Sequence, residues 1–147
     1  MNDGLANLKA TSMRLEVEKT DKITIINDCY NASPDSMKSS IEVLMTKAAM
    51  RRVAILGDMY ELGSKTKEAH EDVGSFAKGK IDLLIVIGEN VNNYENGFGS
   101  EHIRKFASKD DFFEEVDNLI NKDDVILVKA SRGMRFEEVI SKLKELK

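Results

Sequence analysis

The sequence predicts an α/β fold of three layers, in which a mainly parallel β-sheet has helices on both faces and one antiparallel strand at its edge. Three observations support this prediction. Short apolar segments rich in Ile and Val alternate with segments whose apolar residues recur at helical spacing. The later strand segments end in small or polar residues, and only a short polar turn separates the first two. Strands that alternate with helices pair in parallel through right-handed crossovers, so helices cover both faces of the sheet.

The antiparallel edge is predicted from the first two strand segments. Residues 13–19 alternate apolar and polar side chains, as a strand with one exposed face does. The apolar segment 23–26 follows after a short polar turn, so we expect the two segments to pair as a hairpin.

The remaining elements follow from apolar periodicity and helix caps. Residues 34–49 are predicted to form a helix, with Ser33 as the N-cap and Pro34 at its first position. Segment 81–88 is the most apolar strand and is therefore predicted to lie at the centre of the sheet. The other predicted strands are 51–58, 102–107 and 124–130, and the other predicted helices are 65–78, 109–120 and 136–146, with a short helix or loop at 91–99. These elements describe one Rossmann-like domain over residues 1–147.

Composition restricts the possible functions. A chain of 147 residues with 41% hydrophobic residues can bury a substantial core, and its net charge of -4 argues against general nucleic-acid binding. No apolar run reaches the length of a membrane span, and the first residues show no signal-peptide pattern, so we expect a soluble intracellular protein. The single cysteine, Cys29, has no disulfide partner or zinc-ligand spacing, and we interpret it as structural.

Three polar loops are predicted to meet at one edge of the sheet, because parallel strands end on the same side. They comprise residues 28–31, 57–63 and 129–135. Their carboxylates, cations and hydroxyl or amide groups belong to Asp28, Asp58, Glu61, Lys129, Arg132, Arg135, Tyr30, Asn31 and Ser131. Opposite charges on one rim suit a zwitterionic or phosphorylated ligand. The alternative is that Lys129 and Arg132 only form ion pairs with Asp58 or Glu61, and that the polar residues before a helix are caps.

The remaining motifs do not have the spacing of a phosphate-binding or metal-binding site. Residues 57–66 resemble a phosphate-binding loop, but five residues separate the two glycines and Ser64 precedes Lys65, so the spacing is wrong. No His, Cys and carboxylate cluster has metal-ligand spacing. His70 is interpreted as a packing or surface residue of its helix rather than a catalytic one. Asp58 and Glu61 are placed on the exposed rim, where Asp58→Ala would change stability by less than about 0.5 kcal/mol.

The loop sequences resemble the C-terminal domain of the Mur ligase family. The resemblance covers nearly the whole chain and includes residues 4–9, 13–16, 27–37, 56–63, 70–74 and 128–135. The motifs Tyr-Asn-x-x-Pro-Asp-Ser-Met and Gly-Asp-Met-x-Glu-Leu-Gly are typical of the members that add D-alanyl-D-alanine. This chain departs from the family pattern at Ala130, where the family has Gly, and at Phe136, where it often has Met.

The resemblance implies an ATP-dependent ligase of cytoplasmic peptidoglycan precursor synthesis. The carboxylate of UDP-N-acetylmuramoyl-tripeptide would be phosphorylated by ATP, and the amine of D-alanyl-D-alanine would attack the acyl phosphate. In such ligases one domain binds the UDP-sugar and a central domain binds ATP and Mg²⁺, and neither is present in this chain. The chain alone would hold no catalytic residue, metal ligand or cofactor, and we expect it to be inactive alone.

The resemblance also implies roles for individual rim residues. Arg14 would reach nucleotide phosphate, Asp28 the ribose, and Tyr30 and Asn31 the nucleotide and the incoming substrate. Lys129, Ser131 and Arg132 lie on the loop that grips the carboxylate of the incoming amino acid, and Asp58 and Glu61 are assigned to the dipeptide side. For Arg14 the alternative is a solvated cross-strand ion pair.

A second interpretation is a free-standing flavodoxin-like or receiver-like module that binds a ligand or partner at the same rim. The sequence lacks the acidic cluster that a receiver has at the end of its first strand. The ligase domain is therefore the favoured hypothesis.

Overall fold

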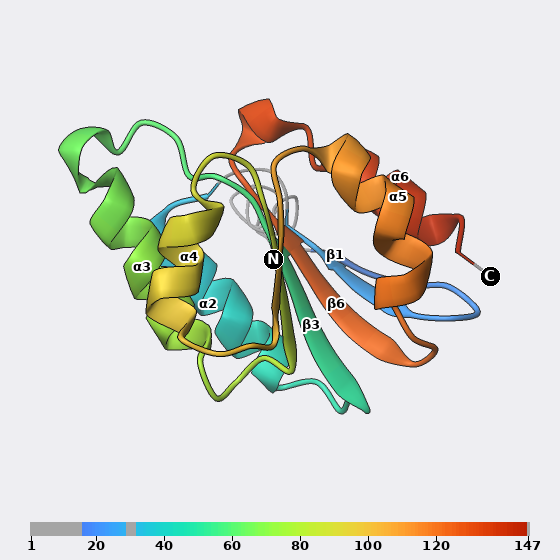
Figure 1. The fold of residues 1–147 in the computed structure, drawn as a ribbon. Helices are drawn as coiled ribbons and strands as arrows, with labels where there is room; N and C mark the ends of the chain where they lie inside the picture. Colours follow the sequence, from blue (N-terminus) through green and yellow to red (C-terminus); the bar gives the residue numbers. More distant parts are fainter. Residues whose placement is uncertain (1–15, 29–31, 147) are drawn as a thin grey trace, which may run out of the picture.

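A six-stranded sheet forms the middle layer of the computed structural model, which describes residues 16–28 and 32–146 (Figure 1). Its strand order is β1-β2-β6-β3-β4-β5, and the β1–β2 pair is antiparallel whereas the other pairs are parallel. The strands are β1 (Glu16–Lys19), β2 (Thr24–Asn27), β3 (Arg51–Leu56), β4 (Leu83–Ile87), β5 (Ile103–Phe106) and β6 (Asp124–Lys129). The predicted Rossmann-like α/β class and the antiparallel edge strand are confirmed.

Helices cover both faces of this sheet (Figure 1). On one side lie α2 (Pro34–Met45), α3 (Thr66–Ala77) and α4 (Val91–Phe98), and on the other lie α5 (Lys109–Leu119) and α6 (Glu137–Lys144). Two short 3₁₀ helices, η1 (Gly63–Lys65) and η2 (Arg132–Met134), lie in the connections from β3 to α3 and from β6 to α6. None of the helices in the described ranges is long and apolar enough to cross a membrane.

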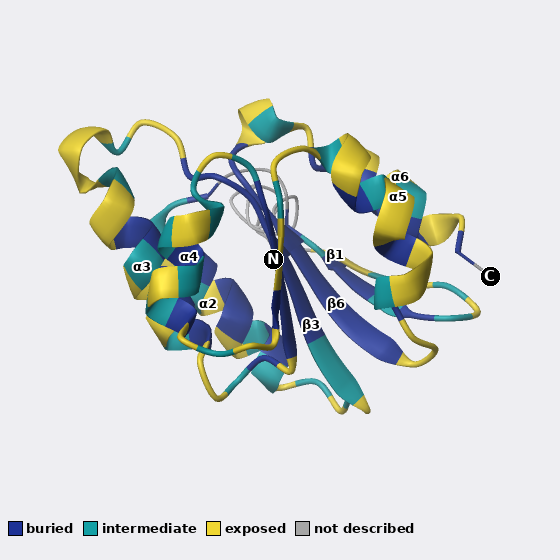
Figure 2. Ribbon diagram, in the orientation of Figure 1, coloured by how far each residue is buried: buried dark blue, intermediate teal, exposed yellow. Residues whose placement is uncertain are grey.

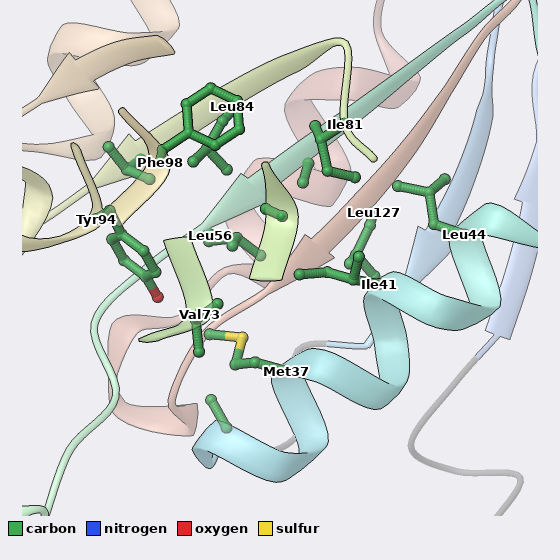
Figure 3. Packing of buried hydrophobic residues seen from close by; sticks show 14 of the residues in the cluster. Met37, Ile41, Leu44, Leu56, Val73, Ile81, Leu84, Tyr94, Phe98 and Leu127 are labelled. Carbon is green, nitrogen blue, oxygen red and sulfur yellow. The ribbon is translucent and has the colours of Figure 1, made fainter. Parts of the chain in front are cut away.

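Strand alternation divides the core into two clusters, one on each face of the sheet. In β3, Ala54 and Leu56 face the first cluster, whereas Val53 and Ile55 face the second. Figure 3 shows the first cluster, in which Met37, Ile41 and Leu44 of α2 lie near strand residues such as Leu127. The outer surfaces of the helices are largely exposed (Figure 2). The amphipathic pattern of the helices is therefore explained by one layer of helices on each face.

The prediction that the most apolar strand is central was wrong. That strand, β4, lies between β3 and the edge strand β5, and β6 and β3 occupy the centre. All five residues of β4 are nevertheless buried. Helices on both faces bury a strand even when it is next to the edge, so apolar content reports burial and not position in the sheet.

Helix α2 ends earlier than predicted, at Met45 instead of residue 49. The Arg52 guanidinium donates hydrogen bonds to the carbonyl oxygens of Leu44, Met45 and Lys47, which lie at the end of the helix. The other end is as predicted, because Ser33 caps the helix in a capping box with Ser36 and Pro34 occupies the first turn. The C-terminus of α2 is therefore hydrogen-bonded to Arg52 of β3, and the local sequence contains no signal for a helix end at Met45.

Helices α3 and α4 pack at unusually short range through two glycines. A Cβ atom on Gly97 would lie 1.8 Å from the carbonyl oxygen of Glu71, and one on Gly74 would lie 2.3 Å from that of Tyr94. Any side chain at these positions would force the helices apart. This close contact brings the Tyr94 hydroxyl to the end of β3, where it donates a 2.6 Å hydrogen bond to the carbonyl oxygen of Gly57.

Candidate functional site

The loops after β3 and β6 are hydrogen-bonded into one rim at the carboxyl end of the sheet, along the upper edge in Figure 1. Gly57 N–H donates to the carbonyl of Lys129 (3.0 Å), and Ser131 N–H donates to that of Asp58 (3.1 Å). The Ser131 hydroxyl oxygen in turn accepts a 2.8 Å bond from Tyr60 N–H. Because Ser131 is hydrogen-bonded to both Asp58 and Tyr60 of the loop after β3, the two loops form a single unit.

A buried ion pair joins the ends of β2 and β6. Lys129 Nζ lies 2.8 Å from Asp28 Oδ2, and both residues are at most 5% exposed. The Ser40 hydroxyl of α2 donates to the same carboxylate oxygen. Asp28 N–H also donates to the carbonyl of Val128, which fixes its backbone beside β6 (3.0 Å). Lys129 therefore pairs with Asp28, and not with Asp58 or Glu61 as the alternative interpretation of the rim supposed.

Asp58 is buried, which corrects its predicted place on the exposed rim. It is 5% exposed, and its carboxylate accepts hydrogen bonds from Glu89 N–H (3.0 Å), Asn90 N–H (2.9 Å) and the Asn90 side-chain amide (3.0 Å). Gly88, at φ 128°, makes room for it, since a Cβ there would lie 2.4 Å from Asp58 Oδ2. Asp58 thus holds the turn between β4 and α4, and its partners lie about thirty residues further along the chain, beyond the reach of a local pattern.

His70 and Tyr94 are buried and each forms a hydrogen bond with the backbone of the loop after β3. His70 is fully buried, and its Nε2 accepts a 2.9 Å bond from Met59 N–H while Nδ1 lies 2.6 Å from the carbonyl oxygen of Thr66. These two contacts require the neutral ring with its proton on Nδ1. The Tyr94 ring packs edge-on against His70, with a centroid distance of 5.0 Å. The packing interpretation of His70 is therefore correct.

Burial lowers the pKa of His70 below its ordinary value of 6.5, although the Thr66 carbonyl and the Asp58 charge oppose the shift. The unfolded chain therefore binds a proton before the folded chain does as the pH falls. We expect the free energy of unfolding to be insensitive to this group above pH 6.5 and to decrease below it, by at most about 1.4 kcal/mol per pH unit.

Denaturant titrations of the chain between pH 7.5 and 5.5 measure this slope. His70→Gln should flatten it, because glutamine does not titrate and its amide oxygen can accept from Met59 N–H. An identical slope in wild type and His70→Gln would contradict the assignment.

Glu61 and Arg132 lie exposed on the rim, and Glu61 adopts a left-handed backbone with φ 63°. Ser131 is buried between the two loops. Arg14, Cys29, Tyr30 and Asn31 lie outside the described residues, so their assigned roles stay predictions. The structure thus brings Asp28, Lys129, Ser131 and the β3 loop together, and places the Asp58 carboxylate in the interior.

Three further residues that shape the rim were missed by sequence reasoning. Ser40 binds Asp28, and the sequence signal was a serine on the apolar face of α2. Lys109, at the start of α5, donates to the carbonyl oxygen of Met134 (2.8 Å) and pairs with Glu138 (2.7 Å), so it fixes the corner between η2 and α6. The third is Tyr60, an exposed aromatic residue of the β3 loop that is 46% exposed.

In residues 16–28 and 32–146 there is no group of three or more His, Cys, Asp or Glu side chains that could hold a metal. The two buried rim carboxylates already have protein partners. Asp28 contacts Lys129 and Ser40, and Asp58 accepts a hydrogen bond from the β4–α4 turn. A hollow of about 1080 Å³ lies at the opposite edge of the sheet, between the β1–β2 turn and the ends of α5 and α6.

A Rossmann-like α/β domain with a polar rim assembled from strand-end loops belongs to the class of folds that present ligand-binding loops at one end of the sheet, and comparison with known proteins identifies the family. The chain belongs to the Mur ligase family: the family model described as Mur ligase, glutamate ligase domain, matches residues 13–132. It is similar to the UDP-N-acetylmuramoyl-tripeptide--D-alanyl-D-alanine ligase of Bacillus subtilis, with 38% identity over 97% of this chain and 33% of that protein. The Escherichia coli ligase of the same name is 36% identical over 97% of this chain and 32% of that protein.

Solved structures agree with this assignment. A MurF crystal structure from Acinetobacter baumannii superposes with a TM-score of 0.83 and 27% identity, over 90% of this chain and 30% of that one. MurF ligase from Thermotoga maritima in complex with ADP gives a TM-score of 0.77 and 29% identity, with the same coverage of 90% and 30%. The chain thus spans about a third of the length of the curated relatives it matches. The regulatory-module alternative is not favoured.

Proposed function

We propose that this chain is the C-terminal domain of an ATP-dependent ligase that joins D-alanyl-D-alanine to UDP-N-acetylmuramoyl-tripeptide. The observation that carries the proposal is the similarity of 97% of the chain to ligases of that name, of which it spans one third. In the proposed reaction, ATP phosphorylates the tripeptide carboxylate and leaves as ADP. The dipeptide amine then attacks the acyl phosphate, forms the amide and releases phosphate. The reaction belongs in the cytoplasm, where ATP is present.

The domain would contribute rim contacts to a site completed by the UDP-sugar-binding and ATP-binding domains of the same protein. Asp28, with Arg14, Tyr30 and Asn31, would face the nucleotide. Lys129 and Ser40 both contact the Asp28 carboxylate and hold its orientation. Asp28 is only 5% exposed, so a ribose hydroxyl would have to reach it at Oδ1, because Lys129 and Ser40 both contact Oδ2.

The dipeptide side of the rim would consist of residues from the two joined loops. Arg132 and Glu61 are exposed and of opposite charge, which suits a zwitterion. Ser131 joins the loops through its hydroxyl and backbone. Lys129 and Asp58, which were assigned direct contacts with the dipeptide, are buried, so we propose that both act by holding the loops in place.

The test compares this chain with the complete protein from the same gene. The gene should encode a Gly-Lys-Thr phosphate-binding loop upstream of this domain. The complete protein should release ADP and phosphate only when the nucleotide-linked tripeptide and D-alanyl-D-alanine are both present with Mg²⁺. This chain alone should neither hydrolyse ATP nor form the amide. Turnover by the purified chain, or a complete protein that does not use the dipeptide, would refute the proposal.

A further inference from the structure

A serine lies on the buried face of α2, where the other buried residues of the helix are all apolar. Ser40 is 3% exposed and lies about two turns beyond the N-cap Ser33, so its hydroxyl does not cap the helix. It donates a hydrogen bond to Asp28 Oδ2 instead. A buried hydroxyl needs a hydrogen-bond partner, so the role of the Ser40 hydroxyl lies in its contact with Asp28.

The two oxygens of the Asp28 carboxylate have different surroundings. Oδ2 accepts from the Ser40 hydroxyl and from Lys129 Nζ, which lies 2.8 Å away. Within residues 16–28 and 32–146, no group donates a hydrogen bond to Oδ1, although the Asp28 side chain is only 7% exposed. A buried carboxylate oxygen without a donor costs free energy, so Oδ1 points to a donor that arrives with a ligand.

The Asp28 carboxylate lies where two neighbouring strands send the chain to opposite faces of the sheet. Strands β2 and β6 are parallel, and Asp28 N–H continues their pairing by donating to the carbonyl oxygen of Val128 (3.0 Å). After β2 the chain enters α2 on one face, whereas after β6 it enters α6 on the other (Figure 1). In open α/β sheets, ligands bind at the carboxyl ends of strands where the connections diverge in this way. Asp28 and Lys129 therefore occupy a ligand-binding position of this class of fold.

The buried pair selects which part of a nucleotide fits beside it. Asp28 and Lys129 together have no net charge, and an ionised carboxylate only accepts hydrogen bonds. ATP can donate hydrogen bonds from its ribose hydroxyls and its adenine amino group, but not from its ionised phosphates. In dinucleotide-binding α/β folds, an acidic side chain accepts a hydrogen bond from a ribose hydroxyl. A ribose hydroxyl is therefore the donor that suits Oδ1.

We infer that Ser40 is a positioning residue for the nucleotide: its hydroxyl holds Asp28 Oδ2 beside Lys129, which leaves Oδ1 to accept a hydrogen bond from a ribose hydroxyl. The inference rests on the proposed function, in which Asp28 faces the nucleotide, and adds the residue that fixes the acceptor. Without the Ser40 hydroxyl, the carboxylate can rotate and share both oxygens with the Lys129 ammonium. A ribose hydroxyl would then meet a less ordered acceptor.

The test measures how the complete ligase that contains this chain discriminates ATP from 2′-deoxy-ATP and 3′-deoxy-ATP. Each analogue keeps the base and the phosphates and lacks one ribose hydroxyl. Wild type should lose about tenfold or more in kcat/KM with the analogue that lacks the bonded hydroxyl, as for a hydrogen bond to a charged group. Ser40→Ala should raise KM for ATP by about threefold to tenfold, the range for one hydrogen bond, and leave kcat and the KM for that analogue unchanged.

Two variants and a stability measurement serve as controls. Ser40→Cys places a weaker donor at the same position and should give a KM for ATP between those of wild type and Ser40→Ala. Ser36→Ala removes a hydroxyl of the same helix that accepts from Ser33 N–H in the capping box. It should lower the melting temperature and leave the discrimination between ATP and the analogues unchanged. Thermal unfolding shows which variants are folded, and Ser40→Cys decides the question if Ser40→Ala is not.

An equal loss for ATP and for both analogues in Ser40→Ala would overturn the inference, because Ser40 would then serve only the structure of the domain. Unchanged discrimination in Ser40→Ala would overturn it as well. A wild type that uses ATP and both analogues alike would also overturn it, since Oδ1 would then bind only water. A wild-type protein that forms no amide with D-alanyl-D-alanine refutes the proposed function and this inference with it. The wild-type measurements therefore distinguish the two failures.

Discussion

Lys129→Met is expected to destabilise this chain by about 3–5 kcal/mol, the typical cost of leaving one member of a buried ion pair without its partner. The Lys129 ammonium lies 2.8 Å from Asp28 Oδ2, and the side chains are only 3% and 7% exposed. Methionine fills a similar volume but leaves the Asp28 carboxylate buried with its charge uncompensated. For a chain of this size the change corresponds to a fall in Tm of roughly 10–15 °C, measured by calorimetry.

A matched substitution separates burial from ion pairing. Lys105→Met removes an ion pair of the same 2.8 Å length, with Glu95, between side chains that are 36% and 42% exposed. It should change stability by less than about 1 kcal/mol. Adding Asp28→Asn to Lys129→Met removes the unpaired charge and should restore part of the lost stability, so the two substitutions are non-additive. Equal losses for Lys129→Met and Lys105→Met would show that the Asp28 pair is effectively solvated.

Asp58→Ala is expected to destabilise the chain by about 3 kcal/mol, because charge-assisted hydrogen bonds at the β4–α4 turn lose their acceptor. The carboxylate accepts from Glu89 N–H, Asn90 N–H and the Asn90 side chain. Thermal unfolding should show a fall in Tm of roughly 10 °C. This expectation replaces the small effect predicted for an acid on an exposed rim.

Two variants control for the loss of the carboxylate at position 58. Asp117→Ala removes an exposed aspartate from α5 and should stay within about 0.5 kcal/mol of wild type. Asp58→Asn keeps one oxygen acceptor but turns an amide group toward backbone donors, so its stability should fall between those of wild type and Asp58→Ala. If Asp58→Ala unfolded at the wild-type temperature, the turn after β4 would need no acceptor from the loop after β3.

The packing interpretation of His70 was correct, whereas the exposed position predicted for Asp58 was wrong. The comparison shows which features a local sequence pattern can predict. His70 lies on α3 at the helical spacing of Val73 and Ala77, so its buried position could be inferred from periodicity. Asp58 follows a strand and precedes a loop, as an exposed ligand-binding acid would. Its role is decided by backbone N–H groups of Glu89 and Asn90, which come within reach only after β4 has paired with β3.

The sequence by itself determined the α/β class, the order of the elements, the N-cap of α2, the antiparallel hairpin and the meeting of the loops after β3 and β6 at one rim. Those features depend on side-chain periodicity and on residues within a few positions of each other, which are visible in a linear chain. Only the tertiary structure decided the central place of β6 and β3, the pairing of Lys129 with Asp28 across one hundred and one positions, and the contact of Ser40 with the Asp28 carboxylate. The physical reason is that strand order and buried polar contacts depend on which distant segments pack together, and local propensity carries no record of that choice.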